Sequence, residues 1–260
     1  MIPFDRDFEP PYGVVERLGP GLRRIMARNP GPFTFRGTAT FIVGEGKVAV
    51  IDPGPELAGH IPALLDGLGG ERVSHILVTH THLDHSPAAA ELKAKTGAPT
   101  YGYGPHGSGP GGMEAGGDPD FEPDVRIADG QLIEGNGWCL EAVHTPGHTS
   151  NHLAFAWPER SILFPGDLVM GWSTSVISPP DGHMGDYLAS LRKVLERDEE
   201  TYWPTHGGPI RDPKPFVEAF IAHRRDREEE ILACLKDGVT AISDMVPVIY
   251  ADVPPAVHAA

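Results

Sequence analysis

A six-residue stretch, His80-Thr81-His82-Leu83-Asp84-His85, places three imidazoles and one carboxylate directly after an apolar run. That run, residues 74–79, has the length and composition of a buried strand, so the polar side chains fall on the loop that leaves it. Imidazole and carboxylate suit zinc, iron or manganese, and neither cysteine of the chain is near this stretch. The stretch therefore predicts a transition-metal site at the end of a strand, and its alternating side chains favour two adjacent ions over one.

The length and composition of the chain indicate a globular protein with many turns. At 260 residues the chain can bury a substantial core as one large domain, or as one domain with a small appendage. The hydrophobic content of 40% and the charged content of 22% are ordinary, whereas 32 glycines and 27 prolines predict loops rather than long helices. The net charge of -15 repels polyanions, which argues against tight nonspecific binding of nucleic acid.

The N-terminal sequence and the cysteines predict a cytoplasmic protein. Residues 1–9 carry neither the basic nor the apolar segment of a signal peptide, and no later stretch has the length and apolar character of a membrane span. Cys139 and Cys234 stand far apart without Cys-x-x-Cys spacing, which predicts two inert thiols in a reducing compartment. A disulfide between the two is the alternative.

Alternating and helical apolar patterns predict the order of the elements in the first part of the chain. A hairpin-rich sheet is followed by a helix with an apolar stripe, the strand before the histidines and a second helix. We expect Ser86 to cap that second helix, with Pro87 in its first turn and Gly97 at its end. The expected ranges are strands at 14–18, 22–27, 33–43, 47–51 and 74–79, and helices at 56–68 and 87–95.

The second half of the chain predicts a loop, a second group of strands and a helical tail. Residues 102–120 are rich in Gly and Pro and almost free of apolar side chains, so we expect a long mobile loop that covers a site. The tail divides the chain into a catalytic domain, residues 1–212, and an appendage, residues 213–260. The expected ranges are strands at 138–143, 153–157, 161–164 and near Tyr202, and helices at 186–197, 215–236 and 240–249.

Three later segments place further histidines and an aspartate after predicted strands. They are His144-Thr145-Pro146-Gly147-His148, Pro165-Gly166-Asp167 and Thr205-His206-Gly207. The order His-x-His-x-Asp-His, Gly-His-Thr, Gly-Asp and Thr-His-Gly resembles the metallo-β-lactamase superfamily across residues 35–210. This resemblance implies an α+β fold, a four-layer αβ/βα sandwich, with two metal ions where the loops of the two sheets meet.

The resemblance also implies the metal ligands. The family's ligand positions are all filled, by His80, His82 and His148 for a first ion, by Asp84, His85 and His206 for a second, and by Asp167 as a bridge. Two Zn²⁺ ions are expected, with iron or manganese as alternatives, and a hydroxide shared by the pair would be the nucleophile. Asp84 would also orient this hydroxide. Asp52 resembles the aspartate that supports a ligand in this family, and an ordinary turn carboxylate is its alternative.

Two further resemblances concern the substrate. Residues 145–152 look like the corresponding segment of glyoxalase II thioesterases, and we expect His152 to pack at the start of a strand rather than to bind metal. The tail motif His223-Arg224-x-x-Arg227-Glu228 is similar to the β-lactamase-like branch that includes the mitochondrial endoribonuclease. That branch implies a small helical, winged-helix-like appendage, here partial. Arg224 and Arg227 would then contact the substrate, and a solvated charged helix face is the alternative.

These observations support one main functional hypothesis and three alternatives. The main hypothesis is a binuclear zinc-dependent hydrolase that cleaves an ester-type or phosphodiester bond. The alternatives are a glyoxalase-II-like thioesterase or lactonase, a mononuclear iron sulfur dioxygenase and a metal-binding scaffold without activity. His183 is either a catalytic proton donor to the leaving group or an ordinary loop histidine. The expected partner is a small-molecule ester, thioester or phosphodiester; RNA is disfavoured by the acidic charge, no membrane is expected, and the oligomeric state stays open.

Overall fold

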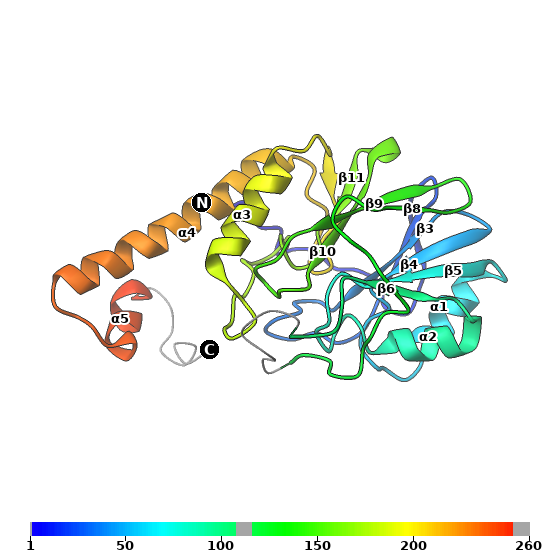
Figure 1. Cartoon of the computed structure of the whole chain (residues 1–260), viewed down its shortest axis with the longest axis horizontal. Coiled ribbons are helices and arrows are strands. Elements are labelled where there is room, and N and C mark those ends of the chain that lie inside the picture. Colours follow the sequence, from blue (N-terminus) through cyan, green and yellow to red (C-terminus); the bar gives the residue numbers. More distant parts are fainter. Residues whose placement is uncertain (1, 108–115, 252–260) are drawn as a thin grey trace. The chain divides into compact units, whose positions relative to one another are not determined.

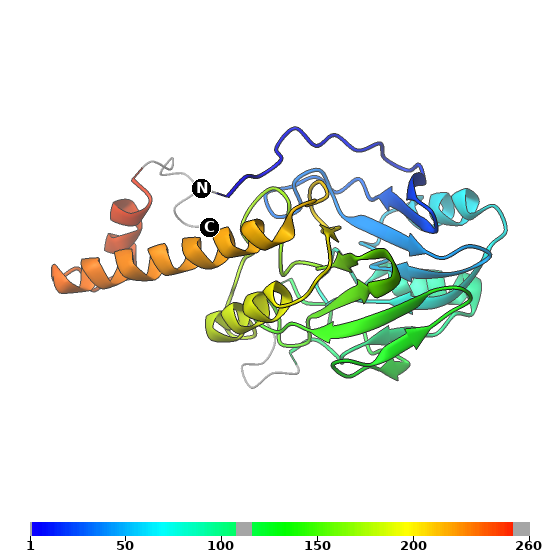
Figure 2. The same cartoon turned by 90° about the horizontal axis from the view of Figure 1, so that it is seen from above.

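The computed structural model describes residues 2–107 and 116–251 and contains two β-sheets (Figures 1 and 2). The first sheet has the order β1-β2-β3-β4-β5-β6-β7, and the second has the order β12-β11-β10-β9-β8. The strands of the first sheet are β1 (Glu16–Gly19), β2 (Leu22–Met26), β3 (Ala39–Val43), β4 (Lys47–Ile51), β5 (Arg72–Leu77), β6 (Thr100–Gly102) and β7 (Val125–Arg126). Those of the second are β8 (Leu132–Glu134), β9 (Cys139–His144), β10 (Leu153–Trp157), β11 (Ile162–Phe164) and β12 (Thr201–Tyr202).

The helices connect and cover these sheets. They are α1 (His60–Leu68), α2 (Ala88–Thr96), α3 (Met184–Leu195), α4 (Pro213–Lys236) and α5 (Ile242–Ile249), with a short 3₁₀ helix η1 (Pro158–Arg160). Strands β1 to β4 pair as antiparallel hairpins, as the sequence predicts, whereas β4, β5, β6 and β7 are parallel neighbours. Parallel neighbours need a crossover connection, and α1 and α2 supply the first two.

Two apolar cores separate the layers. Alternate side chains of β3 point to opposite faces of the sheet, so Phe41 packs toward the second sheet with Phe155, while Ile42 packs with Ile61 of α1 and Leu92 of α2. Figures 1 and 2 show α1 and α2 on the outer face of the first sheet and α3 beside the second sheet. The α+β class and its two-sheet sandwich are therefore as predicted.

The predicted strand at 33–43 is wrong over its first half. Strand β3 begins at Ala39, because the chain turns at residues 31–37 instead of extending. Gly37 has a φ of +125°, and a Cβ there would lie 2.1 Å from the carbonyl oxygen of Ala27. Only glycine fits so close an approach of two backbone segments. The resulting loop between β2 and β3 contacts two of the predicted ligands, His206 and Asp84.

The predicted start of α2 is also wrong. The helix begins at Ala88 and has no side-chain cap, because the hydroxyl of Ser86 donates a hydrogen bond to Oδ2 of Asp118 instead (2.6 Å). Gly97 ends the helix in the left-handed conformation, as predicted. Helix α1 similarly begins at His60 rather than at residue 56, after a left-handed glycine.

Short strands were missed by the sequence analysis. Strands β6, β7 and β8 contain only two or three residues each, too few to show an alternating pattern. Strands β6 and β7 flank the predicted loop at 102–120, of which residues 108–115 lie outside the described residues. On the described sides of that loop, His106 and Asp118 are buried.

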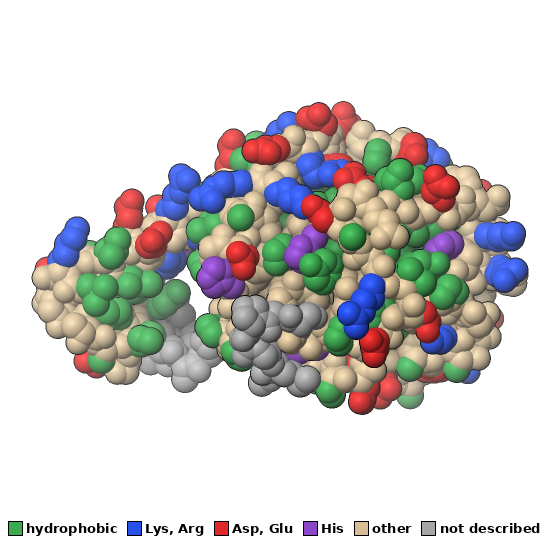
Figure 3. Space-filling view, viewed as in Figure 1, with side chains coloured by type: hydrophobic (Ala, Val, Ile, Leu, Met, Phe, Trp, Pro, Cys, Tyr) green, Lys and Arg blue, Asp and Glu red, His purple; other side chains and the backbone are tan. Residues whose placement is uncertain are grey.

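The chain divides into two compact units, Phe4–Lys214 and a second unit made of Met1–Pro3 and Pro215–Ala260. In the described part of the second unit, Arg227 links α4 to α5. Its guanidinium donates a hydrogen bond to the carbonyl oxygen of Ile249 (2.9 Å) and lies over the ring of Tyr250. Apolar side chains of both helices are exposed on this unit (Figure 3), among them Ile231, Leu232, Leu235, Ile242 and Val248.

Both cysteines are free thiols, as predicted. Cys139 lies on β9 and Cys234 lies on α4, and no disulfide joins them. Of the helices formed by residues 2–107 and 116–251, none combines the length and the apolar composition that a bilayer crossing requires.

Candidate metal centre

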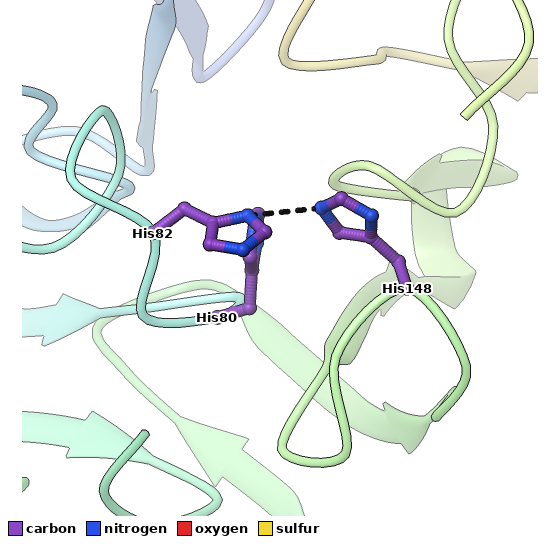
Figure 4. A group of neighbouring side chains, drawn as sticks. All are labelled: His80, His82 and His148. Carbon is purple, nitrogen blue, oxygen red and sulfur yellow. Dashed lines mark hydrogen bonds between the residues drawn. The ribbon is translucent and has the colours of Figure 1, made fainter. Parts of the chain in front are cut away.

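Four loops bring the predicted ligands to one place. The loop after β5 carries His80, His82, Asp84 and His85, and the other three ligands follow the ends of β9, β11 and β12. Figure 4 shows two of these loops facing each other, with His80 and His82 on one side and His148 on the other. All seven predicted ligands fall into groups whose ligand atoms lie within 4.8 Å of one another.

The first group consists of three imidazoles. Nδ1 of His82 lies 3.0 Å from Nε2 of His80 and 3.0 Å from Nε2 of His148 (Figure 4). All three side chains are buried or half-buried. Three ring nitrogens that converge in this way offer one cation three neutral ligands and leave a fourth position open, as in catalytic zinc sites.

The second group combines a carboxylate with two imidazoles, and Asp167 lies between the groups. Oδ2 of Asp84 is 3.1 Å from Nε2 of His206 and 3.4 Å from Nε2 of His85. Oδ2 of Asp167 is 3.6 Å from Nε2 of His85 and also 3.6 Å from Nε2 of His148. One carboxylate oxygen is thus equally near to a ligand of each group, which suits an aspartate shared by two ions.

Two buried atoms of the cluster have no hydrogen-bond partner. They are Nε2 of His85 and Oδ1 of Asp167. Buried polar atoms are almost always paired, because an unpaired one loses its hydration without compensation. A cation at the centre of each group would provide the missing partner, and imidazole with carboxylate is a donor set that divalent transition metals accept. The residues present therefore fit two metal ions.

Hydrogen bonds from Nδ1, on the side of the ring away from the cluster, hold three of the predicted ligand imidazoles in place. Nδ1 of His85 donates to Oδ2 of Asp52 (3.0 Å), and Nδ1 of His206 donates to the carbonyl oxygen of Gly37 (3.0 Å). Nδ1 of His148 donates to the carbonyl oxygen of Val176. Each bond places a proton on Nδ1, so Nε2 is the nitrogen that faces the cluster and is left for a metal ion.

Asp52 lies at the centre of this support. Besides His85, its carboxylate accepts hydrogen bonds from the backbone N–H and the hydroxyl of Thr79, both at 2.8 Å. The residue is buried and has a φ of +49°, in the left-handed region that few residues other than glycine adopt. These contacts hold the ring of His85 in place, and the support of a metal ligand by Asp52 stays a prediction.

Two residues that the sequence analysis missed, Thr38 and Asn29, support the ligand Asp84, and His152 supports Asp167. The hydroxyl of Thr38 donates to Oδ2 of Asp84 (3.3 Å), and the side-chain amide of Asn29 donates to the same hydroxyl (2.9 Å). Nε2 of His152 accepts a hydrogen bond from the backbone N–H of Asp167 (3.1 Å). His152 was predicted to pack at a strand start, and it is fully buried directly before β10. The sequence contained no signal for Thr38.

The electrostatics of the two groups differ. Burial and the neighbouring His82 imidazole lower the pKa of His148 to about 4, and burial holds the pKa of His80 well below its usual value. Burial would also lower the pKa of His206, but the carboxylates of Asp167 and Asp84 outweigh it and raise this pKa to about 10. His80 and His148 are therefore neutral at pH 7, whereas the second group pairs imidazoles with carboxylates.

A cavity of about 460 Å³ opens above the cluster. Its described lining contains the ligands His82, Asp84, His148, Asp167 and His206, together with Phe33, Thr34, Leu83, Gly116, Met170, Val176 and Ser178. Its volume is in the range of small-molecule sites. No Lys or Arg occurs among these described residues, and of those that are not predicted ligands only Thr34 and Ser178 have polar side chains, so the wall above the ligands is mainly apolar.

The remaining predicted site residues lie elsewhere. His183 caps α3, because its Nδ1 accepts the backbone N–H of Asp186 (3.3 Å), and it is not among the described residues that line the cavity. Arg224 and Arg227 belong to α4 in the C-terminal unit, where Arg227 makes the contacts with α5 described above. The first unit therefore brings together the seven predicted ligands and Asp52, and His183 of the same unit is not part of that cluster.

Comparison with known proteins agrees with this geometry. Residues 33–206 match the sequence model of the metallo-beta-lactamase superfamily. A relative from Caenorhabditis elegans named "Beta-lactamase-like protein 2 homolog" is 33% identical over 255 residues, which cover 95% of this chain and 82% of the relative. The "Atrochrysone carboxyl ACP thioesterase" of Claviceps purpurea is 30% identical over 248 residues, which cover 92% of this chain and 74% of that protein.

A solved structure supports the fold independently. The crystal structure of a beta-lactamase domain protein from Burkholderia ambifaria superimposes with a TM-score of 0.80 at 21% sequence identity. The superposition covers 97% of this chain and 85% of that one. At this level of identity the likeness concerns the fold alone.

Proposed function

Because the chain belongs to the metallo-β-lactamase superfamily, we propose that it is a binuclear zinc-dependent hydrolase that cleaves an acyl thioester or a related ester. The observation that carries this proposal is the arrangement of two ligand groups around Asp167 at the floor of an apolar cavity. Each group alone could hold one ion, and the shared aspartate suits a pair.

Each ligand has a proposed place. His80, His82 and His148 would hold one ion, Asp84, His85 and His206 the other, and Asp167 both. A pair of divalent ions, when bound, supplies a Lewis acid that activates water at neutral pH and polarises a carbonyl group. Asp84 lines the cavity and its side chain is 24% exposed, whereas that of Asp167 is 10% exposed. Asp84 is therefore the carboxylate that can accept a hydrogen bond from the attacking water and orient it.

The lining of the cavity favours a carboxylic ester or thioester over a phosphodiester. A phosphodiester carries a negative charge, and the described lining offers no Lys or Arg to meet it. A thiolate leaves readily because its thiol has a pKa of roughly 8.5, whereas an alkoxide needs a proton donor. Apart from the proposed ligands, the polar side chains in that lining are the hydroxyls of Thr34 and Ser178. The name of the Claviceps purpurea relative supports the thioester assignment.

The mononuclear iron dioxygenase is the weaker alternative. A single ion would use one group and leave the other without a role. The unused group would be either the one with the buried Nε2 of His85 or the one with three imidazoles. Metal analysis separates the two hypotheses. Two zinc ions per chain are expected for the hydrolase, and one iron per chain with oxygen uptake on a thiol substrate would overturn it.

The proposed activity is tested on protein of known zinc content. Acyl thioesters, the matching oxygen esters and a chromogenic phosphodiester are compared with and without chelator. We expect turnover to decrease in that order, to stop with chelator and to return with zinc. The variant Asp167→Asn should lower kcat/KM at least about 100-fold and reduce bound zinc, whereas Asp66→Asn, an exposed aspartate on α1, should do neither. Absence of metal-dependent thioester and ester turnover would refute the proposal.

A further inference from the structure

Three large apolar side chains are exposed where the cavity opens. Phe33 is 63% exposed, Leu83 is 52% exposed and Val176 is 45% exposed, and all three line the cavity above the ligands. Isolated exposed apolar residues are common on protein surfaces, but several around one functional cavity mark a binding surface. These three residues are called the apolar rim below.

Each rim residue lies on a segment that either contains a proposed metal ligand or accepts a hydrogen bond from one. Leu83 stands between the ligands His82 and Asp84 in the loop after β5. The backbone carbonyl of Val176 itself accepts the hydrogen bond from Nδ1 of His148. Phe33 belongs to the loop between β2 and β3, in which the carbonyl oxygen of Gly37 accepts the hydrogen bond from His206. The rim is therefore fixed relative to the ligands before any substrate binds.

The loop that carries Phe33 has additional anchors. Thr38, at its end, donates to Asp84, and the ring of Phe35 stacks on Trp172 with the ring centroids 4.9 Å apart. A preorganised apolar surface gains more from ligand burial, because less conformational entropy is lost on binding. The rim thus has the rigidity that selection of a substrate by size requires.

The charges of the residues that line the cavity further restrict the chemical class of the ligand. No Lys or Arg lies among the described residues that line the cavity. A carboxylate or phosphate on the bound acyl group would lose hydration against apolar side chains without gaining a partner. The rim therefore favours an uncharged group.

We propose that Phe33, Leu83 and Val176 bind an uncharged, apolar acyl group of the substrate and set the specificity for its size. This inference rests on the proposed function and names the acyl class that the same site accepts. Each methylene group that the rim fully removes from water should raise kcat/KM about fourfold, until the acyl chain extends past the rim.

The first test measures kcat/KM for thioesters of one thiol with straight acyl chains of increasing length. We expect the octanoyl compound to exceed the butyryl compound by about 10- to 100-fold, and a terminal carboxylate on the octanoyl chain to remove most of this gain. Phe33→Ala should lower the octanoyl-to-butyryl ratio about 10-fold, and Phe33→Leu should restore much of it. Leu132→Ala is the matched control, since Leu132 is 57% exposed on β8 and is not among the described lining residues.

The second test measures binding without turnover. Methyl ketones with the same alkyl chains are titrated by calorimetry into zinc-loaded protein, both wild type and Phe33→Ala. The dissociation constant should fall with chain length, less steeply in the variant. Equal affinity for short and long ketones, or equal slopes in wild type and variant, would overturn the role of the rim. Failure of all thioesters and esters to turn over would refute the hydrolase proposal instead. The ketone series would still show whether the rim binds an apolar chain.

Discussion

The backbone N–H of Asp167 donates a hydrogen bond to Nε2 of His152 (3.1 Å). Since Nε2 accepts this bond, the ring proton of His152 lies on Nδ1, which donates to the hydroxyl of Thr145 (2.8 Å). The imidazole is fully buried and held at both nitrogens. It fixes the backbone at the one aspartate that lies near both ligand groups.

The variant His152→Leu should therefore weaken metal binding although His152 is not a predicted ligand. Loss of the acceptor frees the backbone of Asp167, and supporting groups of this kind are worth about 10- to 100-fold in metal affinity. Zinc affinity measured by competition with a chromogenic chelator tests this expectation. His75→Gln, which changes a histidine of β5 outside the cluster, is the control, and equal zinc affinity in the two variants would contradict the role of His152.

The variant Thr38→Val should lower thioester turnover about 3- to 10-fold while zinc content stays near two per chain. Valine keeps the shape of threonine but cannot donate to Oδ2 of Asp84, so the carboxylate loses one constraint on its orientation. Thr38→Ser keeps the hydroxyl and should recover most of the rate. If serine and valine behave alike, packing rather than the hydrogen bond explains the effect.

The sequence predicted a metal site from the local spacing of His80 to His85, and the resemblance to the family implied the full set of seven ligands. Within His80 to His85 the strand and the turn that follows it determine which side chains point the same way, and His148, Asp167 and His206 each follow a strand in the same manner. That these residues bind zinc stays a prediction. Thr38 could not be found in this way, because it contacts Asp84 across 46 residues of sequence and lies where a continuous strand was expected.

The same distinction between local and distant contacts explains which strands and turns could be predicted from the sequence. Strands such as β3 and β4 were predicted because the apolar pattern and the turns that mark a strand are local in the sequence, and most of their side chains are buried in the structure. The turn at residues 31–37 was missed because Phe33 and Phe35 look like strand residues, whereas Gly37 and the stacking of Phe35 on Trp172 determine the actual path. The stacking of Phe35 on Trp172 joins segments that are far apart in the sequence, so this constraint exists only once the chain has folded.

The variant His183→Ala should lower the stability of the protein rather than its rate. The imidazole accepts the N–H of Asp186 at the start of α3, and loss of such a cap costs about 0.5–1 kcal/mol of the free energy of unfolding. Urea unfolding and thioester kinetics on the same preparation test this, with kcat expected within about twofold of wild type. A much larger fall in kcat for oxygen esters than for thioesters would instead support a role as proton donor to the leaving group.

The buried His60 should make the stability of the first unit depend on pH. Burial lowers the pKa of this imidazole below its ordinary value of 6.5, and its Nε2 lies 3.1 Å from the hydroxyl of Thr40. As the pH falls below about 6.5, the unfolded chain takes up a proton at this position before the folded chain does, so the free energy of unfolding decreases. Above that pH the imidazole is neutral in both states and contributes no slope. We expect the urea midpoint of metal-free protein to fall between pH 7.5 and pH 5.5, and to fall less in His60→Gln. Equal falls in the two proteins would show that other groups carry the dependence.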